Sequence, residues 1–297
     1  MSDFKIITDS TCDLSQEMVD ELEVTVIPMN FTIGADSFLD YPDERDLASH
    51  DFYTRIAAGE SSKTNQISLA TFADTFEPAL KEGMDVLYLA FSSGLSGTYN
   101  NSIIAARDLA EKYPDRKIYM VDTLAASLGE GLIVWHAVQK KRAGATIDEV
   151  KDWVEQNRNR MHHWFTVDDL NHLKRGGRIS GASALVGTML GIKPVMHFDD
   201  EGHIILIDKI RGRKQSLDDL VNHMAKTSED AENQMIFVSH SDSMEGAEYI
   251  KEQVEKKFGT KQFRIAAIGP VIGAHTGTGT VALFYLGKDR EFEQTGK

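Results

Sequence analysis

The chain of 297 residues has one cysteine and only six prolines. Because Cys12 has no second cysteine to pair with, an internal disulfide is excluded, which is typical of a reducing compartment. No apolar run reaches the roughly 18 residues of a membrane-spanning helix, and the opening MSDFKIITDS is too polar for a secretory signal. These absences indicate a soluble protein of the cytoplasm.

Positive charge is also scarce, since 32 Lys and Arg stand against 46 Asp and Glu, a formal charge of −14. This excess repels phosphate backbones, so nucleic acid is not an expected partner. Against this background, KRGGR at 174–178 and RGRK at 211–214 are conspicuous. They are either solvated turns or a cationic rim that meets an acidic partner, a phosphate or lipid headgroups. The rim would consist of Arg175, Arg178, Arg211 and Arg213.

The sequence does contain enough hydrophobic residues, 41%, for two sizeable cores. Buried strands are predicted at 4–8, 24–33, 84–91 and 117–122. Between them, Leu69, Phe72, Phe76 and Leu80 recur at three- and four-residue spacing, which predicts one face of a helix capped by Ser68. Strands alternating with helices of this length favour βαβ units, and hence a parallel, Rossmann-like sheet with helices on both faces.

The second half has a different pattern. Two apolar runs at 193–198 and 203–210 flank DDEG, which predicts an antiparallel hairpin. Further strands are predicted at 234–240, 264–268 and 280–286, and helices at 217–227 and 244–258. We therefore predict two α/β domains, residues 1–163 with the parallel sheet and 164–287 with a mixed or antiparallel sheet. A charged, frayed tail is predicted at 288–297.

Three polar loops each lie where a strand is followed by a helix. They are TNQIS at 64–68, SSGLSGT at 92–98, and 269–280, which includes GAHTGTG. Helix N-termini carry unpaired N–H groups and the positive end of the dipole, so such loops suit an anion. Glycine permits close approach of the backbone, and hydroxyls add donors. The alternative is that these residues only cap helices, as in a pure interaction module.

A catalytic alternative rests on Ser96, Asp122 and His275, which occur in the Ser…Asp…His order of α/β-hydrolases. It would make the protein a serine-dependent acyl-ester hydrolase using Ser96 and His275. The nucleophile elbow, however, needs G-x-S-x-G, and Ser96 is followed by Gly97 and Thr98. No nucleotide-binding fingerprint is present either.

Metal ligands at diagnostic spacing are absent from the sequence. It contains no H-E-x-x-H and no paired C-x-x-C. His162 and His163 are neighbours on a predicted strand and should point to opposite faces. Neither a metal nor a cofactor is expected.

The segments together resemble the DegV family of fatty-acid-binding proteins, from about residue 5 to 286. The resemblance is carried by ITDSTCDL at 7–14, TNQIS at 64–68, SSGLSGT at 92–98, FTVDDL at 165–170, LKRGGRI at 173–179, GIKP at 191–194 and the segment 268–279. It implies a long-chain fatty acid, such as palmitate or oleate, in a tunnel between two α/β domains. It also implies head-group contacts from Thr64, Ser96 and His275, with Ser92, Ser93, Gly97 and Arg178 as neighbours.

The same resemblance implies a non-catalytic carrier without a cofactor, active in lipid transport, fatty acid metabolism and phospholipid synthesis. Such a carrier would present its cargo to a fatty acid kinase for acyl-phosphate formation, and transient membrane contact is compatible with that role. The family loop usually reads Thr-Ser-Gln-Pro-Ser, whereas this chain has Asn65 and Ile67, and Thr278 stands where proline is usual. These departures bear on chain-length preference.

Overall fold

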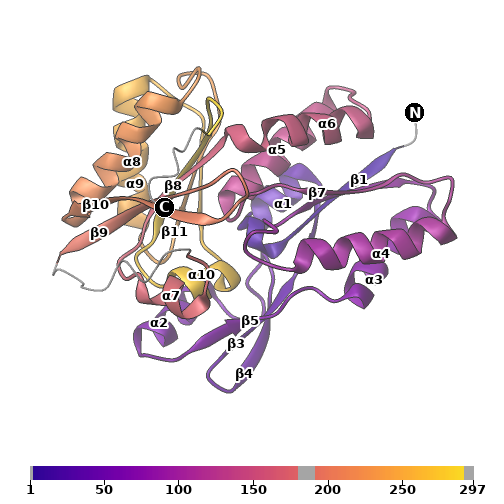
Figure 1. The fold of residues 1–297 in the computed structure, drawn as a ribbon, viewed down its shortest axis with the longest axis horizontal. Helices are drawn as coiled ribbons and strands as arrows, with labels where there is room; N and C mark the ends of the chain where they lie inside the picture. Colours follow the sequence, from indigo (N-terminus) through magenta and orange to yellow (C-terminus); the bar gives the residue numbers. More distant parts are fainter. Residues whose placement is uncertain (1–2, 180–190, 291–297) are drawn as a thin grey trace.

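The computed structural model describes residues 3–179 and 191–290, and its strands form three sheets (Figure 1). The first sheet has the order β2 (Thr25–Ile27), β1 (Phe4–Asp9), β6 (Asp85–Ala90) and β7 (Ile118–Asp122), all parallel. The helices around it are α1 (Gln16–Leu22), α3 (Leu69–Lys81), α4 (Thr98–Lys112), α5 (Leu128–Arg142) and α6 (Ile147–Asn157).

Strand β6 shows why this sheet is covered on both faces. All six of its residues are buried, and successive side chains point to opposite sides. Leu87 and Leu89 pack in the same core as α5, whereas Val86 and Tyr88 pack with Phe72 and the rest of α3. The predicted parallel sheet with helices on both faces is therefore confirmed.

The prediction for α3 is confirmed in most of its detail. The Ser68 hydroxyl accepts a hydrogen bond from the Thr71 N–H at 3.1 Å and caps the helix. Phe72, Phe76 and Leu80 are buried along one face, but Leu69 is 41% exposed. Leu69 is the first residue of α3, where the chain has only just turned into the helix.

The largest sheet has the order β10 (Ile204–Arg211), β9 (Ile192–Phe198), β8 (Met161–Thr166), β13 (Val281–Leu286), β11 (Ile236–His240) and β12 (Phe263–Ala267). All neighbours are antiparallel except β11 and β12, so the mixed sheet and the hairpin of β9 and β10 are as predicted. Helices α8 (Arg213–Thr227) and α9 (Met244–Phe258) pack on one face, and α5 lies against β11 and β13. The division expected at 163/164 falls within β8, which joins this sheet from residue 161.

Several short elements were not foreseen. The expected strand at 24–33 is interrupted at Pro28, so that its second part, β3 (Met29–Ile33), joins a separate sheet. That sheet has the order β4 (Asp36–Asp40), β3 and β5 (Ser62–Thr64). The helices α2 (Ser49–Ala57), α7 (Asn171–Gly176) and α10 (Pro270–Thr276) were also missed.

Helix α10 lies between β12 and β13 in the sequence but is bound to the first half of the protein. The Gly269 N–H donates to the Asp13 carboxylate at 2.9 Å, and the Val271 N–H donates to Asp40 at 3.3 Å. Burial raises the pKa of both carboxyl groups, that of Asp40 to about 7. These long-range contacts hold the first turn of α10.

A second residue, Tyr53, holds the chain just before this helix and packs against the middle of the helix. The Tyr53 hydroxyl of α2 donates to the Ile268 carbonyl at 2.7 Å. A Cβ at Gly273 would lie 2.4 Å from that hydroxyl, so only glycine allows α2 and α10 to approach so closely. Helix α10 is therefore positioned by contacts from across the molecule.

The charged tail is not frayed at its start. Arg290 is 4% exposed, and its guanidinium donates to the carbonyls of Met161, Asp199 and Arg158 at 2.9–3.0 Å. Five N–H donors in a rigid plane suit such a set of acceptors. The prediction of a frayed tail is therefore wrong for residues 288–290, and 291–297 lie outside the described residues.

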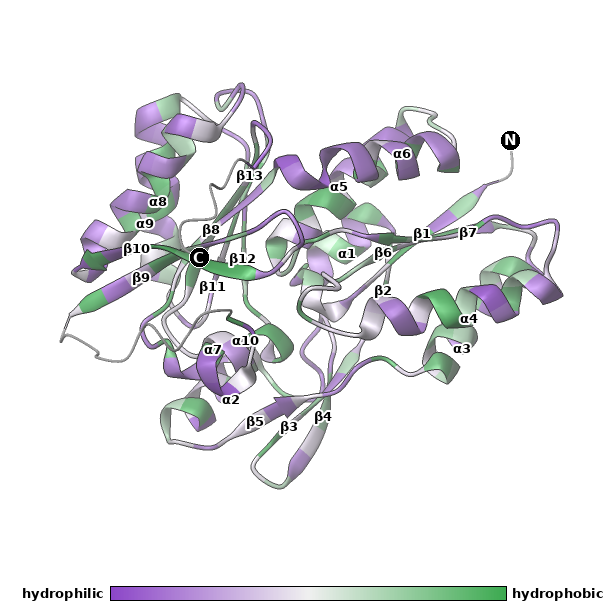
Figure 2. Cartoon of the chain, viewed as in Figure 1, coloured by the Kyte–Doolittle hydropathy of each residue, from purple (hydrophilic) through white to green (hydrophobic). Residues whose placement is uncertain are grey.

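In Figure 2, which colours each residue by its hydropathy, α6 and α8 are mainly hydrophilic. Across residues 3–179 and 191–290, every helix is too short or too polar to traverse a bilayer.

Candidate ligand-binding site

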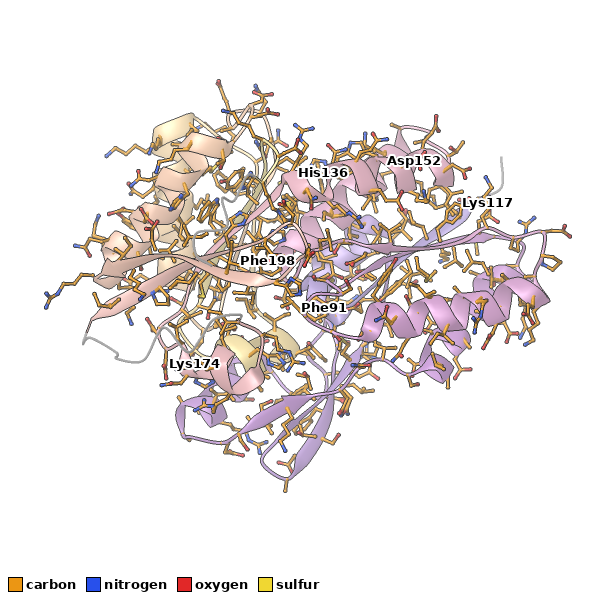
Figure 3. The ribbon with its side chains drawn as sticks, viewed as in Figure 1. Phe91, Lys117, His136, Asp152, Lys174 and Phe198 are labelled. Carbon is orange, nitrogen blue, oxygen red and sulfur yellow. The ribbon has the colours of Figure 1, made fainter. Side chains whose placement is uncertain are left out.

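A cavity with about 800 Å³ of empty space, the open solvent at its edge included, lies between the first and the largest sheet. Its wall is mostly apolar and includes Phe91, Leu95, Phe165, Phe198, Ile272 and Phe284. Figure 3 places Phe91 and Phe198 in the middle of the molecule, where the two halves meet. The sheet face that carries Phe165, Phe198 and Phe284 is the one left free by α8 and α9.

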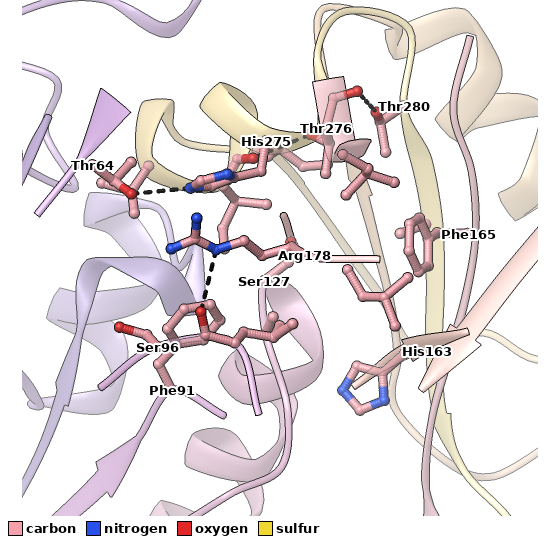
Figure 4. A pocket seen from close by; sticks show the side chains of 18 of the residues that line it. Thr64, Phe91, Ser96, Ser127, His163, Phe165, Arg178, His275, Thr276 and Thr280 are labelled. Carbon is pink, nitrogen blue, oxygen red and sulfur yellow. Dashed lines mark hydrogen bonds between the residues drawn. The ribbon is translucent and has the colours of Figure 1, made fainter. Parts of the chain in front are cut away.

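Polar side chains gather at one end of this cavity. Oγ1 of Thr64, the last residue of β5, lies 3.0 Å from Nε2 of His275 (Figure 4). The hydroxyl of Ser96 and the guanidinium of Arg178 belong to the same wall. The structure thus brings together four of the predicted site residues, which come from segments up to 211 positions apart.

His275 is neutral at physiological pH. Burial, and then the nearby charge of Arg178, lower its pKa to about 4. Its Nδ1 is buried and has no hydrogen-bond partner among the described residues. A helix does begin in this segment, at Pro270, but His275 stands in the last turn of that helix and not at its N-terminus. The imidazole, and not the helix dipole, is what this segment contributes.

Arg178 supplies the positive charge of the site. Its Nε donates to the Leu95 carbonyl at 3.3 Å, and its Nη1 donates to the Gly176 carbonyl. Burial lowers the pKa of the guanidinium, which nevertheless stays protonated because an arginine in a protein is not deprotonated. Among the described lining residues no carboxylate opposes it. This end of the cavity therefore suits an anion.

Three other predicted neighbours do not line the cavity. The buried Ser92 hydroxyl donates to the Gly202 carbonyl at 2.9 Å. Ser93 turns its N–H to the Asp122 carboxylate, and Gly97 packs so closely that a Cβ would lie 2.6 Å from Gln66. These three residues shape the 92–98 loop and are not part of the wall.

The four arginines of the expected rim also separate. Arg175 and Arg211 are exposed. Arg213 is partly buried, donates to the Gly279 carbonyl and lies 3.9 Å from Asp168. Since Arg178 faces the cavity, only Arg175 and Arg211 remain on the outer surface.

The hydrolase alternative lacks its hydrogen-bond chain. Among the contacts of the described residues, the Ser96 hydroxyl pairs with Thr98 at 3.0 Å and Nε2 of His275 pairs with Thr64. The Asp122 carboxylate accepts from backbone N–H groups at the start of two loops. A nucleophile, base and orienting acid in contact are what this chemistry needs.

A group that could hold a metal ion lies elsewhere. Nε2 of His223 is 3.1 Å from Asp208 and 3.2 Å from Asp219, which makes them ordinary ion-pair partners when the imidazole is protonated. Sequence spacing did not indicate this group, because β10 and α8 bring it together.

Among the lining residues that were not foreseen is a buried histidine of β8. His162 and His163 do point to opposite faces of β8: His162 stacks on Tyr285, and His163 stacks on Phe198. Only His163 belongs to the cavity wall. No local signal distinguishes the two, because the choice depends on which face of β8 meets the first half.

The fold and the cavity define a class of protein. In this class a mostly apolar cavity lies between two sheets, and one end of the cavity carries a cation and hydroxyl groups. A family model described as "Uncharacterised protein, DegV family" matches residues 3–288, and the chain belongs to the DegV family. It is 44% identical to a DegV domain-containing protein of Clostridium perfringens, over 98% of this chain and 100% of that one.

Solved structures agree with this assignment. A DegV family protein of Thermus thermophilus, described by its fatty acid binding, has a TM-score of 0.85 and 30% identity, over 97% of this chain and 100% of that one. A stearic-acid-binding protein of Eubacterium ventriosum has a TM-score of 0.84 and 27% identity, over 96% and 98% of the two chains. The predicted family and fold class are confirmed.

Proposed function

We propose that this protein binds one long-chain fatty acid, with its carboxylate at Thr64, Ser96, His275 and Arg178. The observation that carries the proposal is a cation beside a hydroxyl–imidazole pair at one end of an otherwise mostly apolar cavity. The fatty acids bound by the Thermus and Eubacterium relatives support it.

The energetics of such a ligand match the two parts of the cavity. Each buried CH₂ contributes about 0.8 kcal/mol, so the tail supplies most of the binding free energy. A buried carboxylate without partners would cost several kcal/mol, and the charged Arg178 with the neighbouring donors offsets that cost. Because His275 is neutral, it adds no second positive charge, so the carboxylate is bound less tightly than it would be by two cations.

The direct test is extraction of the natively purified protein followed by mass spectrometry. We expect one long-chain acid per chain. A second test measures affinity for a fluorescent fatty acid in Ser96→Ala and His275→Ala, each of which should bind more weakly. Unchanged affinity in both variants would place the carboxylate elsewhere.

We further propose that the protein is a non-catalytic cytoplasmic carrier that presents the acid to a fatty acid kinase. Exposed Arg175 and Arg211 are the candidate docking residues, and transient contact with a membrane is part of the same proposal. The hydrolase alternative predicts labelling of Ser96 by an active-site serine probe, and we expect none.

The docking residues can be tested separately from lipid binding. Arg175→Glu combined with Arg211→Glu should reduce kinase-dependent phosphorylation and leave fatty acid affinity unchanged. Lys256→Glu combined with Lys261→Glu, at two exposed cations in and just after α9, is the matched control for the charge change. Phosphorylation at the wild-type rate in the double variant would refute the docking role.

A further inference from the structure

His163 is a polar residue in the part of the cavity that the proposed head-group site does not use. It is 1% exposed, belongs to β8 and stacks on Phe198 with 4.6 Å between ring centroids. Figure 4 shows it across the pocket from Thr64 and His275. A fatty acid held by its carboxylate at those residues would bring its chain past this imidazole.

The contact with Arg290 indicates which tautomer His163 adopts. Its Nη2 lies 3.2 Å from Nδ1 of His163, and a guanidinium offers only donors. Nδ1 must therefore accept. Burial and then the charge of Arg290 lower the pKa of His163, so the ring is neutral and its one proton is on Nε2.

This Nε2–H has no hydrogen-bond acceptor within the described part of the chain. A Cβ at Gly129 would lie 2.3 Å from Nε2, so α5 closes one side of the ring with backbone that carries no side chain. Phe198 and Phe284 cover other sides with apolar rings. A buried N–H without an acceptor is unfavourable, and His163 is one of the residues that line the cavity, where a ligand oxygen could meet it.

We propose that the cavity is adapted to a fatty acid that carries an oxygen, as a hydroxyl or keto group, on the part of its chain that passes His163. That oxygen accepts the Nε2–H, which a plain methylene chain leaves without a partner. The inference rests on the proposed function and names the class of acid that this site prefers.

The test compares stearic acid with a positional series of hydroxystearic and ketostearic acids. Affinities are measured by displacement of a fluorescent fatty acid from the delipidated full-length protein. At least one isomer should bind the wild type about tenfold more tightly than stearic acid, as one recovered buried hydrogen bond predicts. In His163→Phe, which keeps an aromatic ring without a donor, that preference should disappear, measured as the ratio of the affinity of each isomer to that of stearic acid in the same variant.

The outcomes separate this inference from the function on which it rests. If stearic acid binds but no oxygenated isomer binds more tightly, or if the preference survives in His163→Phe, the subsite does not exist. If none of the acids binds, the proposed function itself is wrong. Should His163→Phe not fold, as judged by thermal melting, the ranking of acids on the wild type still decides.

Discussion

Replacing Arg178 with methionine isolates the charge of the proposed head-group site. Arg178 contacts the Leu95 carbonyl and stands beside a neutral His275, so no other described lining residue can take over its positive charge. A hydrogen bond to a charged group contributes about 1.5–3 kcal/mol. The variant should therefore bind a fatty acid roughly 10- to 150-fold more weakly.

The assay uses two ligands so that charge and packing are separated. Dissociation constants of a fatty acid and of the fatty alcohol of equal length are measured for the wild type and for Arg178→Met. Only the acid should lose affinity, and the difference between the two losses gives the coupling free energy. Arg175→Met, at an exposed cation three residues away, is the control and should affect neither ligand. An equal loss for acid and alcohol would refute the charge pairing and show that Arg178 only packs.

The remaining predictions concern the Thr64 hydroxyl and two titrating groups. Thr64→Val removes one hydrogen bond of about 0.5–1.5 kcal/mol, so fatty acid should bind roughly two- to tenfold more weakly at unchanged melting temperature. Burial raises the pKa of Asp40 to about 7. The unfolded chain releases that proton first, so the contribution of Asp40 to the free energy of unfolding should fall by an amount on the order of 4 kcal/mol as pH rises from about 4 to 7. Asp40→Asn should flatten this slope in urea titrations, and an unchanged slope would exclude Asp40 as its source. Burial lowers the pKa of His136 to about 4, so the contribution of His136 to stability should fall as pH drops from 6.5 towards 4, opposite in sign to that of Asp40. His136→Phe should remove this contribution.

Hydrophobic periodicity predicted the long elements because they are stabilised by their own buried faces. Phe72 and Phe76 define α3 by spacing alone, and the buried run of β6 is bounded by polar turns. Helix α10 could not be predicted in this way, since Gly273 and Gly277 make its sequence typical of a loop. Its amides are held by Asp13 and other residues more than 200 positions away, which no local window contains.

In the candidate site too, some residues could be predicted from the sequence and others depend on long-range contacts. Resemblance to the family indicated Thr64, Ser96 and His275, and the fold brings them to one cavity. The role of Ser92 could not be judged, because its hydroxyl is occupied by the Gly202 carbonyl, 110 residues further on. The inward position of His163 depends on how the two large sheets face each other, and a strand pattern predicts only that alternate residues point to opposite sides.

The attachment of α10 also bears on how cargo is exchanged. The helix follows β12 and precedes β13, yet Asp13, Asp40 and Tyr53 fasten it to the opposite half of the molecule. If the two halves moved apart, the hydrogen bonds from Asp13, Asp40 and Tyr53 would have to break together, or α10 would have to separate from β12 and β13. We therefore expect the two halves of the protein to stay together while the proposed fatty acid is exchanged, with only local adjustments next to the cavity.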